Sequence, residues 1–191
     1  MFSKISEILT QQLENDKIIS SDKRQLYKYG FQNGLIMLLN FATSIIISLI
    51  FNCFLDILFL LITFIPLRSY AGGHHSGSSE KCYVVSTLIS LLWAVLLRFE
   101  ILSSSCCVIM LIIGTVICFV LAPVEDKNKP LDEDEYERYK KRSLIILSCE
   151  IVLWFVFDFN YHKIKGVIPL AIFTESVMLV LGYLKNKKLD R

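Results

Sequence analysis

The sequence has little net charge and lacks the spacings of common metal sites. Its 191 residues carry 20 Lys and Arg against 18 Asp and Glu, a net charge of +2, so no general basic surface for nucleic acid is indicated. Six cysteines and three histidines are present, but they form no CxxC pair and no Cys/His metal spacing. We therefore expect no metal, no cofactor and no nucleic-acid partner.

A secretory signal peptide is also not expected, because nine charged residues precede the first long apolar run. The chain is instead rich in apolar residues. Hydrophobic residues make up 54% of it, whereas a soluble domain has about 45–50% even with glycine counted. The composition predicts an integral membrane protein.

Six apolar segments predict an all-α fold, a polytopic membrane helical bundle. They are residues 34–54, 57–67, 83–97, 101–122, 144–157 and 167–184. A helix needs about 20 apolar residues to cross a hydrocarbon layer of about 30 Å. Two segments, 57–67 and 83–97, are short, so they either cross as short helices or form a re-entrant pair.

An amphipathic helix is expected before the first segment. Its apolar positions are Phe2, Ile5, Leu9 and Leu13, which share one face of a helix. That face could contact lipid or pack on the rest of the protein. A second helix is expected to start at Ser21, and acidic residues that precede basic ones between 125 and 142 predict a solvated helix from about Leu131.

The basic residues predict an orientation. If all six segments cross and the N-terminus is cytoplasmic, seventeen of the twenty Lys and Arg lie on the cytoplasmic side, and only Arg98, Lys163 and Lys165 lie outside. The positive-inside rule then favours cytoplasmic N- and C-termini. We expect one integral membrane domain over 1–191, with N-terminal helices at 1–33, membrane segments at 34–184 and a basic tail at 185–191.

A polar, glycine-rich stretch separates the two short segments. We call residues 68–82, from Arg68 to Cys82, the polar island; it contains two adjacent histidines, paired glycines and four serines. The other five cysteines lie within or beside apolar runs, where cysteine behaves as a small hydrophobe. These are Cys53, Cys106, Cys107, Cys118 and Cys149. Cys82 is therefore the one thiol in a polar setting.

The residue types of the polar island permit cysteine catalysis. Ser78 or Ser79 could cap a helix that begins around Lys81, which would place Cys82 in the first turn, where free N–H groups favour an anion. His75 precedes Cys82 by seven residues, and an intervening turn could bring the imidazole to the sulfur. A buried neutral histidine and an inert cysteine are the alternative.

Three further residues of the polar island could support such a site. Gly72 and Gly73 permit positive φ and the close approach of a substrate backbone. Arg68 could anchor a carboxylate or a substrate carbonyl, or could extend to the membrane interface instead. The group that would orient His75 is left open, with Ser76, Glu80, Asn33, Gln32 and Glu125 as candidates.

The polar island also carries a resemblance. The run Arg68-x-Tyr-Ala-Gly-Gly73-x-His75 followed by Cys82, within six membrane segments, resembles the accessory gene regulator protein B family. These are bacterial membrane cysteine endopeptidases of quorum sensing. The resemblance covers nearly the whole chain, and implies that 1–191 is a membrane peptidase domain that cleaves an AgrD-like precursor signalling peptide.

The resemblance assigns residues as well. It places the nucleophile at Cys82 and the catalytic histidine at His75, and matches Arg68 and Gly73 to residues needed for activity. The family often has a run of lysines between segments four and five, here interrupted as Lys127-Asn128-Lys129; Lys127 and Lys129 are candidate supporting residues. It further implies a thioester intermediate, cyclisation to a thiolactone or lactone autoinducing peptide, a homodimer, and an active site at the cytoplasmic interface of the bacterial cell membrane.

Two other functions compete with this one. Six segments could enclose a path for a transporter or exporter of a small peptide, although charges within the segments are sparse. His74, His75 and Cys82 could instead bind a metal, but adjacent histidines point apart on a helix or strand.

Overall fold

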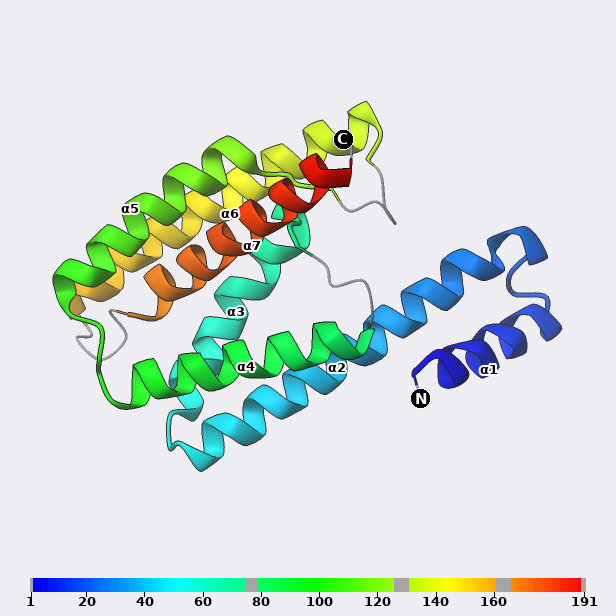
Figure 1. Cartoon of the computed structure of the whole chain (residues 1–191), viewed down its shortest axis with the longest axis horizontal. Helices are drawn as coiled ribbons and strands as arrows, with labels where there is room; N and C mark the ends of the chain where they lie inside the picture. The colour runs from blue at the N-terminus through cyan, green and yellow to red at the C-terminus, as the bar shows by residue number, and fades with distance from the viewer. Residues whose placement is uncertain (1, 75–78, 126–130, 161–165, 190–191) are drawn as a thin grey trace. The chain divides into compact units, whose positions relative to one another are not determined.

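The computed structural model describes residues 2–74, 79–125, 131–160 and 166–189 (Figure 1). Within these ranges the secondary structure is helical, as the sequence predicts. The helices are α1 (Phe2–Asn15), a 3-10 turn (Ser21–Lys23), α2 (Arg24–Ile50), α3 (Phe54–Ala71), α4 (Ser79–Arg98), α5 (Ser104–Leu121), α6 (Glu133–Asn160) and α7 (Val167–Leu189).

Five of these helices are long and apolar enough to cross a membrane. The spans are Ser21–Ile50, Phe54–Ala71, Glu80–Arg98, Ser104–Leu121 and Val167–Lys187. The sixth predicted segment, 144–157, lies inside α6. Many apolar side chains on these helices are exposed, such as Leu55 (74%) and Val120 (69%), which is typical of surfaces that contact lipid. The predicted polytopic helical bundle is confirmed.

The two short segments form longer helices than their apolar runs suggest. α3 has 18 residues and α4 has 20, so α3 is about 27 Å long at 1.5 Å per residue. Both helices recruit flanking polar residues, including Arg68 at the end of α3 and Glu80 at the start of α4. Their lengths favour two crossings over a re-entrant pair.

The start of α6 differs slightly from its prediction. The helix begins at Glu133 rather than near Leu131. The reason is a capping interaction, because a carboxylate oxygen of Asp132 accepts a hydrogen bond from the backbone N–H of Glu135 at 2.6 Å. A side chain that satisfies a free N–H in this way fixes the first turn.

The chain divides into two compact units, Met1–Ile47 with Ser76–Leu91, and Ser48–His75 with Leu92–Arg191. We call them the first and second unit. The prediction of a single domain stays a prediction.

In the first unit, ion pairs join α1 to the beginning of α2. Arg24 contacts Glu7 at 2.6 Å and Glu14 at 3.0 Å, and Lys28 also pairs with Glu7. Ile19, in the connection between the helices, is buried. α1 therefore packs on the protein along one side, while Ile8 on the same helix stays exposed.

These ion pairs predict that acid loosens α1. Lys28 first and Arg24 second hold the pKa of Glu7 below its ordinary value of 4.5. A lowered pKa in the folded state means that the ion pairs stabilise the contact above pH 4.5 and lose that contribution as the pH falls through the lower value. The protection factors of α1 amides against hydrogen exchange, compared with those of α5, should therefore fall modestly between pH 5 and pH 3, because ion pairs at the surface contribute little to stability.

At neutral pH, Glu7→Gln should accelerate exchange in α1 in the same way. Asp16→Asn, which removes a nearby carboxylate that lies just after α1, is the matched control and should leave exchange unchanged. Equal exchange in Glu7→Gln and wild type would contradict the role of the ion pairs.

The second unit is organised around α7, which packs against α3, α5 and α6 (Figure 1). Of the residues in its most apolar stretch, 56% are buried, against 28% in α5 and 33% in α3. Gly114 allows α5 to come close, since a side chain there would lie 2.9 Å from Ile172 of α7. The buried core comprises Leu67, Ala71, Leu111, Cys118, Ala122, Val124, Leu147, Trp154, Ile168, Ile172 and Leu179.

Candidate functional site

The polar island leaves α3 through two glycines that no other residue could replace without strain. Gly72 has φ 78° and Gly73 has φ 106°, conformations that residues with a side chain rarely adopt. Space is also lacking: a side chain at Gly72 would overlap the carbonyl of Val124, and one at Gly73 would lie 2.9 Å from the carbonyl oxygen of Met178. The predicted positive φ is confirmed, and the close approach seen here is to the protein's own backbone.

Backbone hydrogen bonds hold this loop on both sides. The N–H of Val124 donates to the carbonyl of Ala71 at 2.9 Å, and the N–H of Gly73 donates back to Val124 at 3.0 Å. The N–H of His74 donates to the carbonyl of Met178 in α7 at 2.8 Å. The chain is therefore fixed to two separate parts of the second unit up to the residue before His75.

Arg68 holds the same loop through its side chain. It lies in the last turn of α3, and its guanidinium donates hydrogen bonds to the carbonyl of Gly72 and, at 2.6 Å, to the carbonyl of His74. The same guanidinium lies 3.6 Å from a carboxylate oxygen of Glu175. Arg68 is thus engaged inside the second unit, and its direct contact with a substrate stays a prediction.

Gly182 allows the loop to pack closely on α7. A side chain on Gly182 would lie 2.7 Å from the carbonyl carbon of Gly73 and 2.8 Å from the nitrogen of His74. Gly182 lies one helical turn after Met178, so the missing side chain opens access to the Met178 carbonyl. One signal of this contact was visible beforehand, because a glycine within an apolar membrane helix often marks a close approach of another backbone.

Cys82 lies at the start of α4, in the first unit. The helix begins at Ser79, two residues earlier than predicted, so Cys82 is the fourth residue and remains in the first turn. Its thiol is free and partly exposed. The N–H groups of a first helical turn have no partner within the helix, and they favour negative charge nearby.

Polar contacts between α4 and α2 hold the helix that carries Cys82. The hydroxyl groups of Tyr83 and Thr43 are 3.0 Å apart, and those of Ser90 and Ser44 are 2.7 Å apart. Hydrogen bonds between helices in lipid surroundings fix the register of the pair. Cys82 is therefore presented from a helix that is anchored immediately after it.

Five of the residues considered for the site lie outside the described residues. These are His75, Ser76, Ser78, Lys127 and Lys129, so the dyad of His75 with Cys82 stays a prediction. Within the described ranges, no three His, Cys, Asp or Glu side chains lie close enough to hold a metal ion.

Two buried glutamates belong to the second unit and were not singled out from the sequence. Glu175 of α7 is fully buried, and Glu150 of α6 is 3% exposed. The signal was available, because a carboxylate within an apolar segment is costly and commonly has a function. The partner of Glu175 could not be predicted, because Arg68 and Glu175 lie on helices that are far apart in the sequence.

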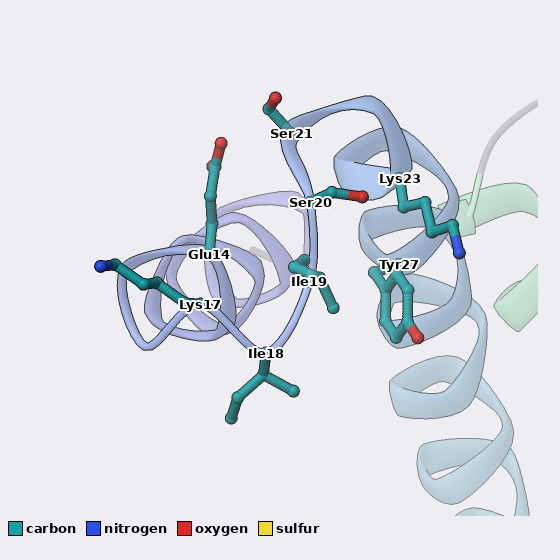
Figure 2. Close-up of a pocket in the computed structure, with 8 residues that line it drawn as sticks. All are labelled: Glu14, Lys17, Ile18, Ile19, Ser20, Ser21, Lys23 and Tyr27. Atoms are coloured by element: carbon teal, nitrogen blue, oxygen red, sulfur yellow. The ribbon is translucent and has the colours of Figure 1, made fainter.

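A separate open groove of about 610 Å³ lies where α1 turns into α2 (Figure 2). Figure 2 shows Ile19 on the side of this turn that faces Tyr27 of α2, with Lys17 on the other side. Among the described residues, none of the predicted site residues lines it. The groove is therefore distinct from the polar island.

Comparison with known proteins identifies the family. The model of the family "Accessory gene regulator B" matches residues 4–179. A putative AgrB-like protein of Clostridium perfringens strain SM101 is 29% identical over 95% of this chain and 87% of its own length. Putative AgrB-like protein 2 of C. perfringens strain 13 is 30% identical, over 80% and 75% of the two chains.

The accessory gene regulator protein B of Staphylococcus haemolyticus is 30% identical over 74% of this chain and 75% of its own length. No solved structure matches. The family model covers most of the sequence, including the polar island and both units. The chain therefore belongs to the accessory gene regulator B family, as a multi-pass membrane protein.

Proposed function

We propose that this protein is a membrane-embedded cysteine endopeptidase that cleaves an AgrD-like quorum-sensing precursor peptide and promotes its cyclisation to a thiolactone or lactone autoinducing peptide. The observation that carries the proposal is the arrangement of the polar island. In the second unit, hydrogen bonds hold its backbone up to His74, and in the first unit Cys82 lies in the first turn of α4, eight residues later in the sequence. Family membership adds independent support.

The first half of the reaction forms an acyl-enzyme. His75 accepts the proton of the Cys82 thiol, and the thiolate attacks the scissile carbonyl carbon of the precursor. The N–H groups at the start of α4 are suited to stabilise the negative oxygen of the tetrahedral intermediate. As the C–N bond breaks, His75 returns the proton to the leaving amine, and the N-terminal part of the precursor remains as a thioester on Cys82.

The second half closes the ring. A thiol or hydroxyl group of the bound peptide attacks the thioester, its proton passes to His75, and the sulfur of Cys82 leaves and regains a proton. Exchange of one thioester for another is nearly balanced, so removal of the product helps to drive it. A site that excludes water and holds the two groups together favours ring closure over hydrolysis.

We place the N- and C-termini and the active site on the cytoplasmic side of the bacterial cell membrane, because seventeen of the twenty Lys and Arg then lie there. The helical surface would also permit a homodimer. Arg68 and the two glycines act as supporting residues by shaping the loop before His75.

The proposal is tested by trapping the thioester. Wild-type protein is mixed with precursor peptide, quenched briefly in acid and analysed by mass spectrometry. We expect a precursor fragment on the Cys82 peptide that hydroxylamine releases, and no such adduct in Cys82→Ala. If Cys82→Ala still cleaved the precursor, Cys82 would be excluded as the nucleophile. If wild type exported the precursor without cleaving it, the transport function would be favoured.

A further inference from the structure

A fully buried carboxylate lies directly behind the loop of the proposed active site. Glu175 is 0% exposed and lies in α7 within a candidate membrane span. Neither of its oxygens makes a hydrogen bond within the described residues. Ionisable groups in such positions are rare and need a counter-charge, so the reason for this glutamate must lie in what it faces.

What Glu175 faces is the guanidinium of Arg68. The distance of 3.6 Å between Arg68 Nη1 and Glu175 Oε1 is that of an ion pair and is longer than a hydrogen bond. Glu175 therefore acts through charge, and leaves the directional N–H groups of Arg68 available for other acceptors. Those acceptors are the carbonyl groups of Gly72 and His74.

Glu175 acts on the loop indirectly, through Arg68. The side chain of Arg68 is only 19% exposed, and a cation that is largely buried is favoured by a partner charge. Two backbone carbonyls alone carry no net charge, whereas the carboxylate does. The charge of Glu175 holds Arg68, and Arg68 holds the backbone on both sides of Gly73.

We propose that Glu175 is a positioning residue of this protein, which fixes the Arg68 guanidinium against the carbonyls of Gly72 and His74 and thereby sets the backbone of residues 72–74, which precede His75 in the sequence. The role in catalysis rests on the proposed peptidase function. The effect on the loop does not, because it follows from the contacts alone.

The test compares two substitutions that are chemically identical. Glu175→Gln keeps the size of the side chain and removes its charge. Glu150→Gln does the same at a buried carboxylate of α6 that also lacks a hydrogen-bond partner within the described residues. The charge of Glu150 repels that of Glu175 and forms no ion pair with Arg68 within those residues, so its removal should leave the Arg68–Glu175 pair intact. Both variants are prepared as the full chain in detergent micelles or lipid nanodiscs.

Two readouts are measured for each variant. The first is the kcat and KM of precursor cleavage, where Glu175→Gln should lower kcat roughly tenfold to a hundredfold with little change in KM, because displaced catalytic geometry costs about this much. The second is hydrogen exchange of the Gly73 and His74 amides, which should accelerate at least severalfold. Glu150→Gln should leave kcat within about twofold and exchange at these amides unchanged.

A third comparison separates positioning from a loss of stability. Since Arg68 and Glu175 act as a pair, Arg68→Lys combined with Glu175→Gln should be no slower than Arg68→Lys alone. Additive losses, or equal losses of kcat in both glutamine variants, would overturn the proposal, as would wild-type exchange and kcat in Glu175→Gln. If wild type did not cleave the precursor, the proposed function would fail, and the exchange measurement would still decide the role of Glu175.

Discussion

Replacing His75 by alanine should reduce precursor cleavage by about a hundredfold to ten-thousandfold, the range that general acid–base catalysis contributes. Without an imidazole, no group is assigned to take the proton of Cys82 or to return it to the leaving amine. Both acylation and ring closure should therefore slow. The measurement is the initial rate of fragment release from a co-purified precursor, with the amount of Cys82 thioester followed in parallel.

The neighbouring histidine provides the matched control. His74 serves the loop through its backbone, because its N–H donates to Met178 and its carbonyl accepts from Arg68. An alanine at this position keeps both hydrogen bonds. We expect His74→Ala to cleave within about fivefold of wild type, as a change that spares buried backbone pairing costs little. The reverse order, with His74 essential and His75 dispensable, would remove His75 from the dyad.

Much of this organisation could be predicted because it is local. Continuous apolar runs predicted the helices. That chemistry concentrates in the polar island stays a prediction. The paired glycines correctly predicted positive φ at positions 72 and 73. The start of α6 was missed by two residues, since the side chain of Asp132 and not the charge pattern decides it.

What could not be predicted is what the loop rests on. Arg68 was expected to reach a substrate or the interface, yet its guanidinium faces two carbonyls of its own loop and Glu175. A sequence shows that an arginine ends an apolar helix, but not which distant helix supplies its counter-charge. Glu175 stands out in the sequence, because a carboxylate within a membrane segment is energetically unfavourable. That Arg68 is its partner is known only from the packing of α7 against α3.

Gly182 makes another contact that the sequence does not show, and replacing it should cause a large loss of activity. An alanine there places a methyl group 2.7 Å from the carbonyl carbon of Gly73 and 2.8 Å from the nitrogen of His74. Both neighbours are backbone atoms, so the loop or α7 must move. A displacement of about 1 Å can cost roughly a hundredfold in rate, and we expect Gly182→Ala to lose cleavage on this scale.

Gly34→Ala in α2 is the matched control, because a side chain there meets nothing within 4 Å. Both substitutions replace a helical glycine, which by itself favours the helix by about 1 kcal/mol. Gly34→Ala should therefore keep full activity and equal or better thermal stability. Gly182→Ala should lose activity and accelerate exchange of the His74 amide while α7 remains helical. If Gly182→Ala cleaved at the wild-type rate, the contact of α7 with residues 73 and 74 would not matter for catalysis, because this close backbone approach could then be widened without loss of activity.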